Sequence, residues 1–411
     1  MKKILLPALL LSLMLSGCKE EKPVELSPVS VPAAEIIDTE LATELETTEP
    51  ATEKATESDS NISPKVARKL KNMSLHEKVC QMFMAVPEKT TYYYDTLTYV
   101  DDWYRNCYTE YPIGGFIYFE ANITYDQQLR DLLSQSQEMA LDNNGIGLFQ
   151  AVDEEGGYVT RVQKRLWKTP VDNMSEYGKL NDYNATYEAG RTIGEYLADY
   201  GFNVNFAPVA DVNISETNEL GNRIFSSDPL VVSDMCTAMI QGLKSHKIAA
   251  TLKHFPGLGA GTGNTHYTTV EIDRTLEQLE IAEFPAFKGG IEAGADFVMV
   301  GHQIVSASGD NLPADLSPVV VTDWLREKMN FEGIIISDSQ AMGAITSTYT
   351  SDEAAIKSIE AGVDIILMPN DLRAAIDGVE AAVKSGDLTK ERIDESVIRI
   401  LEKKNEMGLL N

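Results

Sequence analysis

The sequence predicts an α/β protein built as one (β/α)₈ TIM-type barrel, and three observations carry this prediction. Short apolar runs recur along the chain from about residue 63, amphipathic stretches separate most of them, and charged side chains follow several of the runs. Alternation of strand and helix on this scale indicates parallel strands joined by crossover helices. The carboxyl ends of barrel strands meet at one face, where active sites lie.

Eight apolar runs are the candidate strands. The segment 334–336, three isoleucines with no polar break, is typical of a strand that is buried on both faces. Eight strands are also the number that closes this type of barrel. The runs cover residues 81–86, 115–119, 147–152, 204–208, 248–252, 297–300, 333–337 and 364–368.

Amphipathic stretches at helical period supply the crossover connections. The chain has 411 residues, of which 43% are hydrophobic, enough for one large domain. A doubly wound open sheet is the competing arrangement, but no GxGxxG motif follows a first strand, and the candidate site residues come from too many strands. The predicted helices cover residues 126–143, 185–200, 234–245, 276–293 and 352–361.

The first 18 residues resemble a bacterial lipoprotein signal peptide. Lys2 and Lys3 precede an apolar stretch over 4–15, and the sequence LSGC places small residues directly before Cys18. Cleavage before Cys18 would leave its thiol for a diacylglycerol anchor. A retained transmembrane helix is disfavoured because the apolar run is shorter than the roughly 20 residues that cross a bilayer.

Residues 19–62 are rich in Glu, Thr, Pro and Ala and show no apolar period. This composition predicts a disordered, acidic tether. The catalytic domain is expected over 63–411. The formal net charge of −28 argues against a nucleic-acid partner and against a basic patch for anionic lipid. The lipid on Cys18 is therefore the expected contact with the membrane, on its extracellular face.

Cys80, Cys107 and Cys236 remain after the lipidation site, so at most one disulfide can form. No two of them have metal-ligand spacing, which favours buried or free thiols. Together with the absence of a nucleotide-binding loop, this pattern predicts an enzyme without a metal or cofactor.

Three segments place reactive side chains directly after an apolar run. They are KHFPGLGAGTGNTH over 253–266, GIIISDSQAMGA over 333–344 and DEEGGYVTR over 153–161. Gly- and Pro-rich loops that follow strands commonly hold functional sites.

With GNRIFSSDP over 221–229, these motifs resemble glycoside hydrolase family 3, and in particular its single-domain β-N-acetylglucosaminidases. The resemblance covers nearly all of the chain from Ser63 onward, with four motifs in the family's order. No second domain follows the predicted barrel, unlike the larger β-glucosidases of the family, in which a later domain supplies the acid/base carboxylate.

The resemblance implies the two catalytic roles of a retaining glycosidase. Asp338, at the end of a predicted strand, would be the nucleophile; an Asp at this position can alternatively cap a helix. His266 would be the acid/base, since an imidazole with its ordinary pKa near about 6.5 exchanges protons at neutral pH. The family pairs this histidine with an aspartate two residues earlier, where this chain has Asn264. The amide could orient the ring but would not supply a full negative charge.

The resemblance also implies the residues that hold the sugar. Asp153 would accept from hydroxyls, while donors would come from Arg161, Arg223, Lys253 and His254. His254 has an alternative interpretation as a buried core histidine. Weaker candidates are Asp211, as support for another site residue, and His302, at a further strand end.

The expected function is an exo-acting retaining β-N-acetylhexosaminidase that removes N-acetylglucosamine-type sugars from cell-wall or glycan fragments. Two alternatives stay open: another family activity, β-glucosidase-like or phosphorolytic, and a degenerate sugar-binding lipoprotein. The presence of Asp338, Arg161, Lys253 and His266 argues against the degenerate protein. The oligomeric state is not predicted.

Overall fold

The computed structural model describes residues 62–91 and 96–411. The predicted signal segment 1–18, its Cys18, and residues 19–61 of the predicted tether lie outside the described residues. In the described part of the chain, no helix has both the length and the apolar character needed to cross a membrane. The first helix begins at Pro64, where the side chain of Ser63 caps it by accepting the N–H of Val66.

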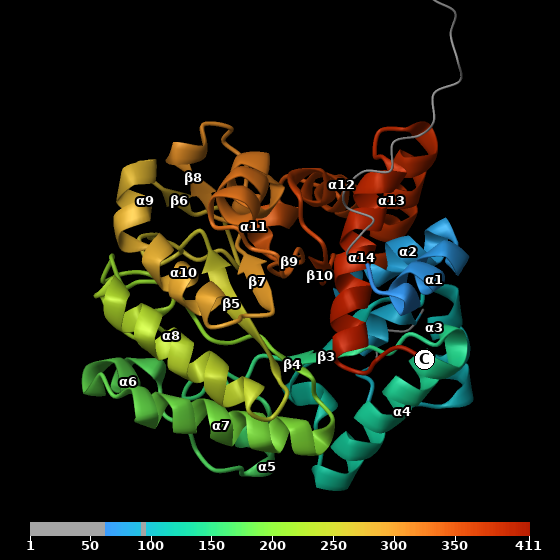
Figure 1. Ribbon diagram of the computed structural model, residues 1–411, viewed down its shortest axis with the longest axis horizontal. Helices are drawn as coiled ribbons and strands as arrows, with labels where there is room; N and C mark the ends of the chain where they lie inside the picture. Colours follow the sequence, from blue (N-terminus) through green and yellow to red (C-terminus); the bar gives the residue numbers. More distant parts are fainter. Residues whose placement is uncertain (1–61, 92–95) are drawn as a thin grey trace, which may run out of the picture. The chain divides into compact units, whose positions relative to one another are not determined.

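Eight parallel strands form the centre of the molecule, in the order β10-β1-β2-β3-β4-β5-β7-β9 (Figure 1). A parallel bridge between Ile336 of β9 and Ile365, next to β10, brings the two ends of the sheet together. The prediction of a barrel is confirmed, and all eight predicted strand segments contribute a strand. They are β1 (Phe83–Ala85), β2 (Gly115–Tyr118), β3 (Phe149–Val152), β4 (Val204–Asn205), β5 (Ala249–Phe255), β7 (Phe297–Val300), β9 (Ile334–Ser337) and β10 (Ile366–Leu367).

Helices surround the barrel, with α7 packed on α8, α8 on α10, and α1 on α14 (Figure 1). The α-helices are α1 (Pro64–Asn72), α2 (Leu75–Gln81), α3 (Asp102–Glu110), α4 (Asp126–Asn144), α5 (Val162–Leu166), α6 (Met174–Leu180), α7 (Tyr183–Tyr200), α8 (Pro229–Lys244), α9 (Leu276–Ala282), α10 (Phe284–Glu292), α11 (Gly343–Thr346), α12 (Ser351–Ala361), α13 (Leu372–Ser385) and α14 (Lys390–Glu406). A π-helix, η7 (Val319–Lys328), precedes β9, and short 3₁₀ turns lie at η2 (Pro87–Thr90), η3 (Glu120–Asn122), η4 (Gly221–Arg223), η5 (Ser306–Ser308) and η6 (Ala314–Leu316).

One predicted helix differs from the structure. The single helix expected over 276–293 is divided at Glu283 into α9 and α10. Pro285, in the first turn of α10, has no N–H to donate to the preceding turn, so it is accommodated at a helix start rather than in a helix interior.

The barrel interior is packed with side chains. Phe149 of β3 and Phe297 of β7, on strands that are not neighbours in the sheet, meet edge to face with ring centroids 5.3 Å apart. Lys404 of α14 is fully buried and donates to Gln81 Oε1 at 2.7 Å and to the Gly114 carbonyl at 2.8 Å. Because Gln81 and Gly114 precede β1 and β2, these bonds close the amino-terminal end of the barrel and leave the opposite end for a site.

A two-stranded parallel sheet, β6 (Glu271–Ile272) with β8 (Ile304–Val305), joins the segments that follow β5 and β7. The loop after β5, which contains His266, is thereby tied to the loop after β7. The three cysteines of the described chain, Cys80, Cys107 and Cys236, are buried free thiols.

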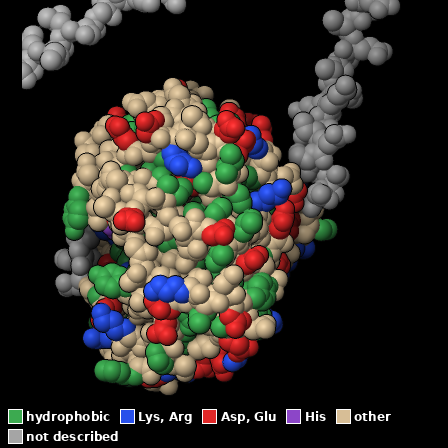
Figure 2. Space-filling model, turned by 90° about the vertical axis from the view of Figure 1, so that its left-hand side faces the viewer, with side chains coloured by type: hydrophobic (Ala, Val, Ile, Leu, Met, Phe, Trp, Pro, Cys, Tyr) green, Lys and Arg blue, Asp and Glu red, His purple; other side chains and the backbone are tan. Residues whose placement is uncertain are grey.

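The surface carries charges of both signs. Figure 2 shows acidic and basic side chains interspersed on one face, where Lys and Arg do not gather into a patch. Acidic residues outnumber basic ones in the chain as a whole, 63 to 35. A surface of this kind offers little electrostatic attraction to a polyanion.

Candidate active site

A cavity of about 1280 Å³ opens at the carboxyl ends of the barrel strands. It brings together side chains that are up to 251 positions apart in the sequence, from Ile117 to Met368. Its lining includes every residue predicted for catalysis or sugar binding: Asp153, Arg161, Arg223, Lys253, His254, Asn264, His266 and Asp338. The two weaker candidates, Asp211 and His302, lie behind the lining residues and contact them or their neighbours.

Asp338 follows β9 directly, and its backbone N–H continues the sheet by donating to the Val300 carbonyl at 2.8 Å. Its Oδ1 accepts the Ser339 N–H at 2.7 Å. Burial by itself would raise the pKa of Asp338, but the nearby His254 and His302 hold this pKa below the usual value of an aspartate. The carboxylate is therefore ionised at neutral pH, as a nucleophile requires.

His302 is fully buried between two acceptors. Its Nδ1 lies 2.9 Å from Asp315 Oδ1, and its Nε2 lies 2.9 Å from the Ser339 carbonyl. Both ring nitrogens must carry a proton to make these bonds, which describes an imidazolium. Burial would lower the pKa of His302, but the charges of Asp315 and Asp338 and the bond to Ser339 raise it to about 9. His302 thus places a positive charge behind Asp338.

A buried ion network forms another wall of the cavity. Lys253 Nζ lies 2.8 Å from Asp153 Oδ1 and 2.7 Å from Glu155 Oε1, and Arg223 binds both oxygens of Glu155 at 2.8 Å. Burial would raise the pKa of Glu155, but Arg223 and Lys253 hold it well below its usual range. Glu155 was not predicted as a site residue. The run of three acids in DEEGG is the signal that could have indicated it, but the sequence predicts a binding role for Asp153 alone.

Glu154 positions Arg161. Its carboxylate accepts the N–H groups of Arg161 at 2.7 Å and of Val162 and Gln163 at 2.8 Å, at the start of α5. The Arg161 guanidinium lies 5.5 Å from the ring centroid of Phe119. Among the described residues, Arg161 Nε is buried and has no hydrogen-bond partner, while the Arg161 side chain lines the cavity.

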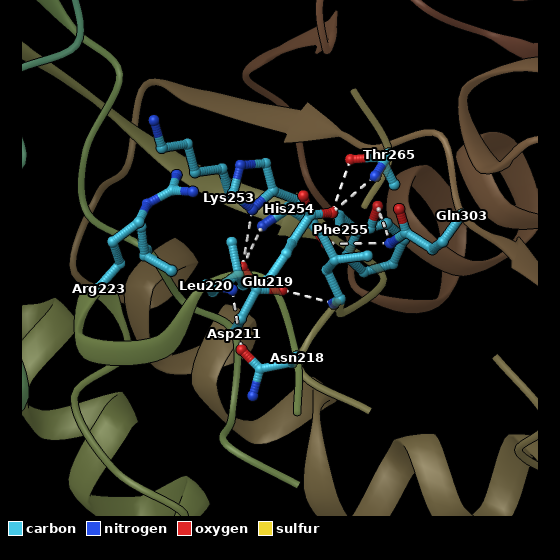
Figure 3. A network of polar contacts seen from close by, with 12 residues as sticks. Asp211, Asn218, Glu219, Leu220, Arg223, Lys253, His254, Phe255, Thr265 and Gln303 are labelled. Carbon is cyan, nitrogen blue, oxygen red and sulfur yellow. Dashed lines mark hydrogen bonds and ion pairs between the residues drawn. The ribbon is translucent and has the colours of Figure 1, made fainter. Parts of the chain in front are cut away.

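Asp211 sets the orientation of His254. The Nδ1 of His254 lies 2.8 Å from Asp211 Oδ2, while Asp211 Oδ1 accepts the Leu258 N–H at 2.6 Å (Figure 3). A proton shared with Asp211 on Nδ1 leaves Nε2 for a ligand. His254 is buried, as the alternative interpretation expects, yet it also lines the cavity.

His266 is exposed on the loop after β5, at the rim of the same cavity. Its backbone is held twice: its N–H donates to Asn264 Oδ1 at 2.9 Å, and its carbonyl accepts the Gly343 N–H at 3.0 Å. Gly343 lies shortly after Asp338, so the His266 loop rests on the segment that follows β9. Glu219, which the sequence did not single out, also lines the cavity beside this loop.

The arrangement combines the ionised carboxylate of Asp338, the solvent-accessible imidazole of His266 and several fixed donors in an open cavity. Such a set can attack an electrophilic carbon, move a proton to or from oxygen, and bind several hydroxyl groups. Within residues 62–91 and 96–411, no group of three or more His, Cys, Asp or Glu side chains is placed to hold a metal ion.

Known proteins are similar to this chain in sequence and in fold. Residues 74–403 match the model of the glycosyl hydrolase family 3 N-terminal domain. Beta-hexosaminidase A of Pseudoalteromonas piscicida is 30% identical over 325 residues, which are 73% of this chain and 54% of that protein, so the chain spans about half of its length. The beta-hexosaminidase of Idiomarina loihiensis is 30% identical over 72% of this chain and 88% of that protein. A solved family 3 beta-N-acetylglucosaminidase from a Paenibacillus species superposes with a TM-score of 0.77 at 33% identity, over 82% of this chain and 63% of that one.

Proposed function

Because this chain belongs to glycosyl hydrolase family 3, we propose that it is an exo-acting, retaining β-N-acetylhexosaminidase that releases N-acetylglucosamine-type sugars from cell-wall or glycan fragments. The observation that carries the proposal is that the ionised Asp338 and the loop with His266 line the same cavity. The names of the similar proteins, beta-hexosaminidase and beta-N-acetylglucosaminidase, support the choice of sugar.

In the proposed first step, a carboxylate oxygen of Asp338 attacks the anomeric carbon of the sugar. The bond from that carbon to the glycosidic oxygen breaks, and His266 gives its proton to the departing oxygen. The product is a glycosyl ester on Asp338 and a neutral His266. The lowered pKa of Asp338 supports this role, because the carboxylate needs no deprotonation before the attack.

In the second step, His266 accepts a proton from a water molecule as the water oxygen attacks the same carbon. The ester bond to Asp338 breaks, which regenerates the carboxylate and the protonated imidazole and releases the sugar with its original β configuration.

The remaining lining residues would bind the sugar hydroxyls and the acetamido group. Lys253 and Arg223 are locked by Asp153 and Glu155, so their donors are oriented before a ligand arrives. His254, held by Asp211, adds a directed donor, and Arg161 adds its guanidinium in the cavity wall. Preoriented donors lower the entropic cost of fixing a sugar relative to Asp338.

We further propose, on the sequence alone, that Cys18 is lipidated and that the enzyme acts at the extracellular face of a bacterial membrane. The motif LSGC and the acidic stretch that follows are the support for this location.

A panel of chromogenic β-glycosides, assayed with and without inorganic phosphate, tests the proposed activity. We expect hydrolysis of the β-N-acetylglucosaminide, at least about tenfold faster in kcat/KM than the β-glucoside, and no acceleration by phosphate. Faster cleavage of the β-glucoside, or release of a sugar phosphate, would assign the other family activities. Binding of N-acetylglucosamine without turnover of any substrate would indicate the degenerate protein.

A further inference from the structure

The His266 loop contains no carboxylate that could pair with the imidazole. Asn264 occupies the position two residues before His266, and its Oδ1 accepts the backbone N–H of His266 at 2.9 Å. Within the part of the chain that the structure describes, no hydrogen bond joins the Asn264 side chain to the His266 ring. Asn264 therefore shapes the loop backbone and leaves the ring without a charged partner from its own segment.

A carboxylate from a different loop reaches this segment. Glu219, in the connection between β4 and α8, accepts from both donors of Thr265, the residue directly before His266 (Figure 3). Its Oε1 lies 3.0 Å from the Thr265 backbone nitrogen and 2.8 Å from Thr265 Oγ1. Two bonds to one buried residue fix the position of the carboxylate against the loop.

The segment that carries Glu219 is itself fixed. The Oδ1 of Asn218 accepts the N–H groups of Leu220 at 2.9 Å and of Gly221 at 3.0 Å. Earlier in the same connection, the Ser215 N–H donates to the Gly259 carbonyl of the β5 loop at 2.9 Å. The two loops are thus joined at two points, and Glu219 is held in place by its neighbours as well as by Thr265.

The free oxygen of Glu219 stands in the cavity wall. Both bonds to Thr265 use Oε1, and among the described residues Oε2 makes no hydrogen bond. The side chain is half-buried and lines the cavity together with His266. Thr265, which Glu219 holds, is bonded directly to His266, and both Glu219 and His266 line the cavity. A negative charge close to an imidazole stabilises its protonated form.

We propose that Glu219 supplies the carboxylate that Asn264 does not: it positions His266 through Thr265 and stabilises the protonated form of its ring. Glu219 is a positioning residue that acts through His266 and does not touch the reacting atoms. The inference rests on the proposed function, in which His266 is the acid/base. It explains how this chain can keep acid catalysis with an amide at position 264.

The test compares Glu219→Gln with Glu216→Gln. Glutamine keeps an oxygen that can accept from Thr265 and removes only the charge. Glu216 is an exposed residue of the same connection, outside the cavity lining, so its substitution removes the same charge from the same segment without touching Thr265. The readouts are kcat/KM against pH, and the rates on a β-N-acetylglucosaminide with a poor leaving group and on one with an activated aryl leaving group.

With Glu219→Gln, we expect the basic limb of the kcat/KM profile to move to lower pH by about half a unit to one unit. Turnover of the poor leaving group should fall about tenfold, and turnover of the activated one by about threefold or less. Glu216→Gln should leave the basic limb and the turnover of both substrates unchanged. Adding Asn264→Asp to Glu219→Gln should restore the basic limb, because a carboxylate again lies beside His266.

An unchanged basic limb in Glu219→Gln, equal losses on both leaving groups, or an equal shift in Glu216→Gln would overturn the proposal. A double variant that behaves like Glu219→Gln would also contradict it. His266→Ala separates these outcomes from a failure of the proposed function. If this variant keeps full activity on the poor leaving group, the acid/base assignment itself is wrong, whatever Glu219 does.

Discussion

His302 and Asp338 are coupled through a single residue between the ends of β7 and β9. The Nε2 of His302 lies 2.9 Å from the Ser339 carbonyl, while the N–H of Ser339 donates to Asp338 Oδ1 at 2.7 Å. The imidazolium thus fixes the peptide that orients the carboxylate, and its charge also helps to keep that carboxylate ionised. The protonation state of a fully buried histidine is therefore linked to the state of the proposed nucleophile.

This coupling predicts a loss of stability at alkaline pH. The pKa of His302 is raised from its ordinary 6.5 to about 9 in the folded protein, so its contribution is fully present below about pH 6.5 and is lost as pH rises through about 9. We expect the free energy of unfolding to fall by on the order of 3 kcal/mol between these values. Urea unfolding at a series of pH values measures this. The same slope in His302→Gln would assign the effect to other groups.

Asp338→Asn should abolish nearly all turnover, by a factor on the order of 10⁴, because the covalent intermediate cannot form without the carboxylate. Its circular dichroism spectrum should match that of the unaltered protein. Asp323→Asn, at an exposed position of η7, is the matched control and should keep full activity. A slow fluorinated donor should label the peptide that contains Asp338; a label on another carboxylate would refute the assignment.

His266→Ala should slow poor leaving groups by about 100-fold or more and activated aryl glycosides much less, since only the former need a proton to depart. Asn264→Asp should have the opposite effect and speed the poor leaving groups, because it adds a charge beside the imidazole. Steady-state rates on a series of leaving groups test both. A flat response across the series would move the acid/base role away from this loop.

Glu155→Ala should destabilise the protein by about 3–5 kcal/mol. It removes the carboxylate that binds both Arg223 and Lys253 and leaves buried positive charge without its partner. Chemical denaturation gives the midpoint and slope of the unfolding transition, and from these the free energy of unfolding. Glu138→Ala, on the exposed side of α4, serves for comparison and should change stability by less than about 0.5 kcal/mol. Equal effects of the two substitutions would show that the network contributes nothing.

Cys18→Ala should release the full-length protein from the membrane fraction of the expressing bacterium, because the proposed diacylglycerol anchor can no longer be attached. Fractionation followed by immunoblotting measures the distribution, with Cys107→Ala as a variant that leaves the proposed lipidation site intact. A Cys18→Ala protein that stays with the membrane would argue against the anchor.

The strands were predictable because parallel barrel strands are buried on both faces, and continuous apolar runs such as 334–336 have no other common explanation in this context. The helix boundary at Glu283 was harder to predict. The amphipathic period continues across it, and only Pro285 signals that a second helix begins.

The residues of the candidate site also differ in how far the sequence predicts them. Asp338 directly follows β9 and Lys253 lies in the last part of β5, so their position in the sequence indicates their place in the cavity. Glu155 and Glu219 lie in irregular loops, where no periodicity tells which way a side chain points. Their roles follow from partners far along the chain, such as Arg223 for Glu155 and Thr265 for Glu219. A single sequence without the fold does not reveal such pairs.

The bond from the Gly343 N–H to the His266 carbonyl, together with the β6–β8 pairing, has a further consequence for turnover. A loop that closed only on substrate would lose conformational entropy at every encounter, and this loss would weaken binding. Here much of that ordering takes place once, when the chain folds. Substitutions that loosen these anchors should therefore raise KM for every glycoside alike, whatever its leaving group.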